Sequence, residues 1–131
     1  MAPRRAILAL AVSVVLAGIP ALAHHSFAAE YDGNKPFKMS GVVTKFDLTN
    51  PHSWIHIDVK GQDGNVVSWA FETASPNILF RRGIKKDFLK PGTMVTIEGF
   101  LAKDASHTGN AQKLTMPDGT QVILGTEVNP G

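Results

Sequence analysis

The sequence contains no cysteine, and this absence excludes several kinds of site. Without thiols the chain forms no disulfide, no thiolate metal site, no cysteine nucleophile and no lipid-modified N-terminal cysteine. Long apolar runs are also scarce. The longest, residues 6–17, is shorter than the roughly 20 residues that a membrane-spanning helix needs. No internal repeat or low-complexity segment is visible. A mature domain of this composition depends on its packed core alone.

The first residues have the layout of a secretory signal peptide. Arg4 and Arg5 precede the apolar run, and the small residues Ala21 and Ala23 supply a cleavage site. We therefore expect residues 1–23 to be removed on export. An uncleaved anchor is the alternative, and twin-arginine export stays open because the two arginines are adjacent.

No excess of charge remains once this leader is removed. The whole chain carries a formal net charge of +2, from 13 Lys and Arg against 11 Asp and Glu. Two of the basic residues, Arg4 and Arg5, lie in the leader, so the mature chain is close to neutral. A neutral chain has no long-range attraction for nucleic acid or anionic lipid. We expect a soluble periplasmic or secreted protein with no membrane span and no nucleic-acid partner.

Alternating hydrophobicity predicts a mostly β domain. In the clearest run, residues 52–59, Ile55 and Ile57 face the core, whereas His52, Trp54 and His56 face outward. The residues before this part of the chain, from Ser26 to Pro36, are polar and rich in turn formers, which indicates an arm or loop. The other expected strands cover residues 39–46, 66–72, 94–101 and 111–116, with a final run at 121–124.

A turn and a helix place these strands in a known order. Residues 61–65 are rich in Gly and Asn and predict a hairpin. Ser75 at the cap, Pro76 at the first helical position and Gly83 at the end mark a short helix. In an OB-like five-stranded barrel a short helix lies between strands 3 and 4, and we expect this fold here. The alternative is a two-sheet sandwich without the helix. The expected domains are a signal peptide at 1–23, an N-terminal arm at 24–38, the barrel at 39–125 and a tail at 126–131.

Six short motifs are spread over the mature chain. They are His24-His25-Ser26-Phe27, Asn50-Pro51-His52-Ser53-Trp54-Ile55, Trp69-Ala70-Phe71-Glu72, Ser75-Pro76-Asn77, Arg81-Arg82-Gly83 and Leu89-Lys90-Pro91-Gly92. As a set, these motifs closely resemble the DUF6152 family of exported bacterial proteins over roughly residues 24–125. The resemblance implies a small secreted or periplasmic domain. It implies no catalytic residues, because the family has no assigned function.

Cleavage after Ala23 would place a histidine at the mature N-terminus. His24 then offers its α-amine and imidazole, and His25 adds an imidazole and an amide nitrogen. Nitrogen ligands of this kind suit Cu(II) best among the available divalent ions. The hypothesis is a copper site on His24, aided by His25 or by one histidine from the barrel. The chain is similar to histidine-brace copper proteins only in this terminal histidine, which does not transfer their oxidase chemistry. The alternative is a solvated terminus that binds only adventitious metal.

His52 and His56 are the candidate metal ligands on the barrel. On a regular strand, which rises about 3.3 Å per residue, their Cα atoms lie roughly 13 Å apart. Ligand nitrogens sit about 2 Å from an ion, so a site shared by both is disfavoured. One of them joining His24 is the easier arrangement. His107 lies in an expected loop and is not placed relative to His24 by the sequence.

Trp54 and Phe27 form the candidate surface for a small ligand or an envelope protein. An exposed tryptophan also stacks nucleobases in some proteins, but export and the near-zero charge disfavour nucleic acid here. The alternative is that these residues bind no partner and belong to a sheet face half covered by the N-terminal arm.

No catalytic constellation is visible. Ser26 follows His25 and Ser53 follows His52, but adjacent residues on an extended segment point apart, so neither pair joins a nucleophile to a base. We expect a binding module rather than an enzyme, with copper-dependent redox activity as the enzymatic alternative. The rival class is a structural or interaction domain of the cell envelope that needs no metal.

Overall fold

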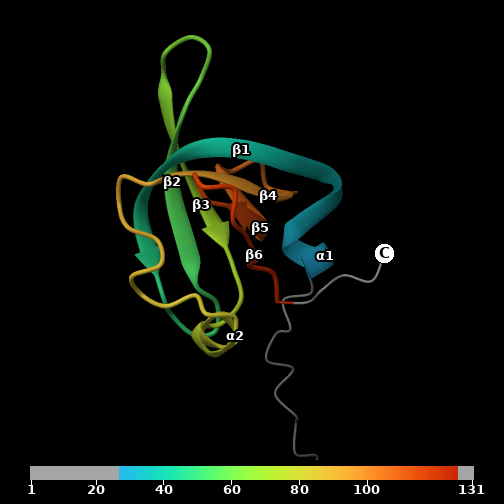
Figure 1. Ribbon diagram of the computed structural model, residues 1–131. Coiled ribbons are helices and arrows are strands. Elements are labelled where there is room, and N and C mark those ends of the chain that lie inside the picture. The colour runs from blue at the N-terminus through green and yellow to red at the C-terminus, as the bar shows by residue number, and fades with distance from the viewer. Residues whose placement is uncertain (1–26, 127–131) are drawn as a thin grey trace, which may run out of the picture.

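Strands make up most of the computed structural model, which describes residues 27–126 (Figure 1). Within these residues no helix has the length and apolar character needed to cross a membrane. The short helix between the third and fourth strands, which the sequence predicts, is present. In chain order the elements are α1 (Phe27–Glu30), β1 (Tyr31–Asp47), β2 (Trp54–Lys60), β3 (Val66–Glu72), α2 (Pro76–Arg81), β4 (Met94–Ala102), β5 (Thr108–Thr115) and β6 (Gln121–Ile123).

The strand pairings form a closed circuit. The sheet has six strands in the order β3-β2-β1-β4-β5-β6, and β3 also pairs with β5. The β3–β5 pairing is parallel and short, joining residues 70–72 to residues 108–110, whereas the other pairings are antiparallel. The sixth strand is the expected final run, and it lies outside the circuit on the edge of β5.

The core fills the inside of this circuit. Ile55 and Ile57 are fully buried, as the alternation in β2 predicts, and Phe71 is fully buried on β3. The predicted hairpin joins β2 to β3 with Lys60 opposite Val66. In Figure 1 this hairpin extends beyond the rest of the domain. The inward face of both strands is therefore the one that the sequence assigns to the core.

The first strand begins earlier than the sequence predicts. Instead of an arm or loop up to Pro36, residues 27–30 form α1 and β1 starts at Tyr31. Pairing with β4 explains the difference, because Tyr31 lies opposite Ala102 and the ladder resumes at Pro36. The register shifts between these two positions, where the polar residues Asp32 to Lys35 interrupt the hydrophobic pattern.

The helix α2 follows its predicted signals with one exception. Pro76 opens the helix, and Gly83 follows it with a φ of 81°, the left-handed conformation that favours glycine. Ser75 occupies the N-cap position but makes no capping hydrogen bond through its side chain. The helix contributes Leu79 to the core.

Candidate functional site

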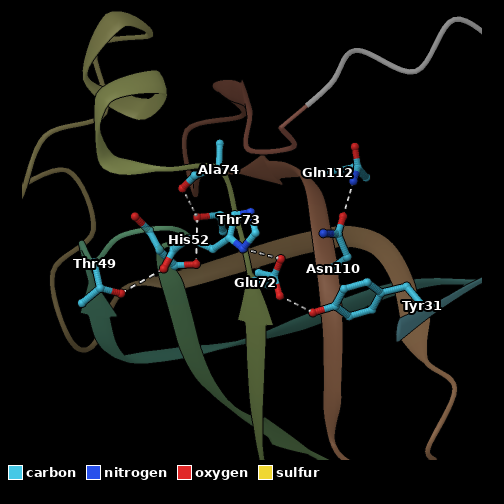
Figure 2. A network of polar contacts seen from close by, with 9 residues as sticks. Tyr31, Thr49, His52, Glu72, Thr73, Ala74, Asn110 and Gln112 are labelled. Carbon is cyan, nitrogen blue, oxygen red and sulfur yellow. Dashed lines mark hydrogen bonds and ion pairs between the residues drawn. The ribbon is translucent and has the colours of Figure 1, made fainter. Parts of the chain in front are cut away.

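One buried carboxylate links three distant segments of the chain (Figure 2). The hydroxyl of Tyr31 donates a hydrogen bond of 2.7 Å to Oε2 of Glu72. The other carboxylate oxygen, Oε1, lies 3.0 Å from Nδ1 of His52. Glu72 and Tyr31 are 8% and 4% exposed. Tyr31, Glu72 and His52 are called the carboxylate network below.

Backbone pairing brings the members of the carboxylate network together. In the β2–β3 ladder Trp54 lies opposite Glu72, and pairing continues past the strand ends, where the amide of Ser53 donates to the carbonyl of Ala74. This extension brings His52, two positions before the start of β2, beside Glu72. The hydroxyl of Thr49 donates a hydrogen bond of 2.9 Å to the carbonyl of His52. The Asn50–Pro51 peptide bond, which lies between these two residues, is cis.

The surroundings of Tyr31 keep its hydroxyl protonated. Burial raises the pKa of Tyr31 well above its usual range, and the hydrogen bond to Glu72 raises it further. The negative charges of Glu72, Glu30 and Asp104 act in the same direction. The phenol is therefore a fixed donor to Glu72 over the whole physiological pH range.

The two strand histidines contact different carboxylates. His56 Nε2 lies 3.5 Å from Oδ2 of Asp47, and the same carboxylate oxygen lies 2.8 Å from the ammonium of Lys45. His52 instead contacts Glu72. Among residues 27–126 there is no group of three or more His, Asp or Glu side chains placed to hold a metal ion. The other two candidate ligands, His24 and His25, lie outside the described residues, as does the expected signal peptide.

The remaining histidine, His107, lies in the loop between β4 and β5, as expected. Its ring centroid is 5.0 Å from that of Trp69, and its carbonyl accepts a hydrogen bond of 3.1 Å from the amide of Ala70. This loop therefore caps the end of the β3–β5 pairing. His107 is exposed and makes its side-chain contact with an aromatic ring.

Trp54 borders an open hollow next to the carboxylate network. The hollow has a volume of about 340 Å³ and lies between α1, β2 and the β4–β5 loop. Phe27 packs beside it, with its ring centroid 5.8 Å from Tyr31 and 5.3 Å, edge-on, from Phe100. The hollow is lined by Ala29, Glu30, Tyr31, Trp54, Ala102, Lys103, Asp104, Ser106 and Thr108.

Two of these functional candidates were not identified from the sequence. Glu72 reads as a strand-end charge, yet it is the buried centre of the carboxylate network. The predicted hairpin contains the missing signal, because pairing across residues 61–65 places Glu72 opposite Trp54 and so next to His52. For Tyr31 no local signal exists, since its contact with Glu72 spans 41 positions.

Comparison with solved structures shows a likeness in fold. The mitochondrial single-stranded DNA-binding protein Rim1 of S. cerevisiae matches with a TM-score of 0.50 and 14% sequence identity, covering 63% of this chain and 93% of that one. This likeness supports a β-rich, OB-like fold. Two structures of TiaS, one with a transfer RNA and ATP and one with agmatine, match with a TM-score of 0.47 and 25% identity, over 72% and 76% of this chain. The match covers only 19% and 24% of the TiaS chains.

A family assignment is available from the sequence as a whole. No curated protein matches the chain. A family model does match, over residues 11–112, which include the β2–β3 hairpin, α2 and all three residues of the carboxylate network. The chain belongs to DUF6152, a family of unknown function.

Proposed function

We propose that this chain is a small exported binding module, an OB-like β-barrel that binds Cu(II) through His24 after residues 1–23 are removed. The closed circuit of strand pairings supports the barrel, because such a circuit leaves five strands with a partner on each side. Removal of the leader creates the free α-amine that the site needs.

The chemistry of the terminus favours copper over the other divalent ions. The α-amine and imidazole of His24 are two nitrogen donors on one residue, and His25 adds two more. Cu(II) stands at the top of the affinity order for such ligands and accepts their tetragonal arrangement. The chain has no thiolate to compete for the ion.

One structural observation supports the proposal: Phe27, close in sequence to His24, packs beside the functional candidates. Phe27, three positions after His24, packs against Tyr31 and Phe100 next to the hollow. Three extended residues reach about 10 Å. His24 is thus within about 10 Å of Phe27 along the chain, which is compatible with a metal held near the surface that carries Trp54.

Calorimetric titration of the mature protein with Cu(II) tests the proposal. Protein that is exported with its own leader should begin at His24, which mass spectrometry can check. We expect a Kd below about 1 µM, equivalent to a binding free energy of about −8 kcal/mol or better. His24→Ala should weaken binding by at least tenfold, because it removes an imidazole from the chelate.

A matched control separates the amine from the imidazoles. Mature protein with the α-amine of His24 acetylated keeps both terminal histidines but removes the α-amine from the chelate. We expect it to bind as weakly as His24→Ala. Binding at about 1 µM or weaker that neither change alters would show that the terminus binds only adventitious metal, and the proposal would fail.

The rival proposal is an interaction domain without metal. The projecting β2–β3 hairpin supports it, because Val66 at its tip is 58% exposed and β3 has a free edge there. Periplasmic protein purified with no copper, and with no copper affinity after purification, would favour this function. Retention of copper through purification would favour the metal-binding module.

Nucleic acid and redox chemistry are not part of the proposal. Negative charges outnumber positive ones around Trp54 and disfavour phosphate, since Glu72 lies opposite it in the ladder and the hollow is lined by Glu30 and Asp104 against Lys103. A fluorescent single-stranded oligonucleotide at low salt should therefore show no binding by anisotropy. Peroxide formation that depends on bound copper would instead show the enzymatic alternative.

A further inference from the structure

We infer that the segment from Phe80 to Lys90 is a docking surface for a membrane that contains anionic phospholipid. This segment, called the basic surface below, covers the end of α2 and the turns that follow it. The inference goes beyond the proposed copper site and does not depend on it, since the basic surface shares no residue with the terminal histidines or the carboxylate network.

Charge is distributed unevenly over a chain that is nearly neutral in total. Residues 80–90 carry five basic side chains and one acidic side chain, whereas the rest of residues 27–126 carries six basic and nine acidic side chains. The near-zero total removes long-range attraction, but charges within about 8 Å of a surface still act at physiological ionic strength. An anionic surface therefore attracts the basic surface and repels the rest of the domain, which orients the molecule.

The cations of the basic surface are available to an external partner. Four of them are exposed and form no ion pair among residues 27–126, namely Arg81, Lys85, Lys86 and Lys90. The fifth, Arg82, has a structural role, because its Nη1 donates to the carbonyls of Ile123 at 3.0 Å and Gly125 at 2.7 Å. The four exposed cations are thus the ones that a partner can contact.

Buried residues hold the basic surface in one shape. Leu79 and Ile84 are fully buried and Leu89 is 2% exposed. The amide of Ile84 donates a hydrogen bond of 2.9 Å to the carbonyl of Leu79, and the amide of Phe88 donates one of the same length to the carbonyl of Lys85. The cations extend from a backbone that is already ordered, so docking costs little backbone entropy.

An exposed aromatic ring lies among these cations. Phe80, between the buried Leu79 and the exposed Arg81, has 46% of its surface exposed. A bilayer offers phosphate groups to the cations and an apolar layer to the ring, and lysines beside an exposed phenylalanine are typical of surfaces that lie on membranes. An anionic polymer would satisfy the charges but offers no such layer. The combination therefore favours a membrane.

The basic surface lies at one end of the molecule. In Figure 1 α2 and the projecting β2–β3 hairpin are at opposite ends. A flat membrane can therefore meet α2 without obstruction by the hairpin. The hairpin end has its own exposed apolar side chain, Val66, which supplies a control of similar chemistry far from the basic surface.

The test measures the binding of the purified exported protein to vesicles at about 150 mM salt. Vesicles of phosphatidylcholine alone are compared with vesicles that also contain phosphatidylglycerol, and we expect at least tenfold tighter binding to the anionic ones. Lys85→Gln combined with Lys86→Gln should weaken that binding by roughly 10- to 30-fold, because each cation near such a surface contributes about fivefold. Phe80→Ala should weaken it by about 3- to 10-fold, because the ring no longer leaves water.

Two matched controls change the same chemistry elsewhere. Lys35→Gln combined with Lys38→Gln removes the same charge from exposed positions of β1, and Val66→Ala shortens an exposed apolar side chain of the hairpin. Each should alter binding to the anionic vesicles by less than about twofold, since screening limits the effect of distant charges. Circular dichroism checks the fold of every variant, and the comparison of the two kinds of vesicle tests the wild-type protein without any substitution.

Three results would overturn the inference. Equal binding to neutral and anionic vesicles would show that the cations do not dock on lipid. An equal loss in the β1 double variant would show that total charge matters rather than the basic surface. Binding that Phe80→Ala leaves unchanged, and that a single-stranded oligonucleotide displaces, would show a site for anionic polymers instead of a membrane.

Discussion

The two halves of β3 lie in different surroundings although their sequence alternates in the same way. Among residues 27–126, the outer half, Val66–Trp69, pairs with β2 alone, whereas the inner half, Ala70–Glu72, pairs with β2 on one side and β5 on the other. Val66 and Glu72 point to the same face of the strand, yet Val66 is 58% exposed and Glu72 is 8% exposed. Burial along this strand is therefore set by where the strand circuit closes, and the inner half carries the carboxylate network.

The largest difference should come from truncating one apolar residue in each half. Phe71→Ala removes a fully buried ring that stacks on Phe37 at 4.8 Å and on Trp69 at 5.9 Å. We expect a loss of about 3–5 kcal/mol in the free energy of unfolding, measured by urea denaturation. Val66→Ala in the outer half should cost less than about 0.5 kcal/mol. Equal losses would show that closure of the circuit does not decide burial.

The next largest difference should come from removing the Tyr31 hydroxyl, which contacts the inner half of β3, and the Ser68 hydroxyl in the outer half. Tyr31→Phe leaves the buried Oε2 of Glu72 without its donor, and we expect a loss of about 1–3 kcal/mol. Ser68→Ala, in the outer half, removes a hydroxyl that donates to the exposed Asp58 at 2.6 Å. That change should cost less than about 0.5 kcal/mol, because water replaces the lost donor. The two variants are compared in the same denaturation experiment.

Adding a methyl group where β3 pairs with β5 should lower the free energy of unfolding by a similar or smaller amount. Gly109 lies opposite Phe71 in the parallel pairing, and a Cβ there would come within 2.8 Å of the Phe37 ring and 3.0 Å of the Phe71 ring. Gly109→Ala should therefore destabilise the protein by about 1–3 kcal/mol through overpacking. Gly33→Ala is the control, since its nearest new contact would be 3.9 Å away. A Gly109→Ala variant as stable as wild type would mean that the rings around the β3–β5 pairing move to accommodate the added methyl group.

The hairpin and the core face of β2 were predictable because both depend on local signals. Alternation over residues 52–59 gives the buried face, and the turn residues 61–65 fix the register that pairs β2 with β3. The start of β1 was not predictable in this way. Its first residues are polar and become a strand only through pairing with β4, far along the chain.

The residues of the candidate site also differ in whether local sequence predicts them. His52 and Trp54 follow from the strand pattern, and Glu72 follows from the hairpin register once that register is applied. Tyr31 does not, because its hydroxyl reaches Glu72 only when β1 joins β4 and β3 joins β5. Local sequence and the hairpin register therefore place His52 beside Glu72, and closure of the circuit adds Tyr31.

The smallest expected effect is a pH dependence that belongs to the inner half alone. Tyr31 is the only tyrosine in the chain, so ultraviolet absorption of phenolate reports its titration directly. Its folded-state pKa is raised by burial and by Glu72, whereas in the unfolded chain it is about 10. The folded protein should therefore form no phenolate at pH 10.5, and urea should restore it.

This shift has a defined sign for stability. Above pH 10 the unfolded chain loses the Tyr31 proton while the folded chain keeps it, so stability falls as pH rises. The loss attributable to Tyr31 should reach about 0.8 kcal/mol at pH 10.5. Subtracting the pH dependence of Tyr31→Phe removes the contribution of every other group. An identical pH dependence in the two proteins, or phenolate at pH 10.5 in folded wild type, would place Tyr31 in contact with solvent and show that its hydroxyl does not hold Glu72 in place.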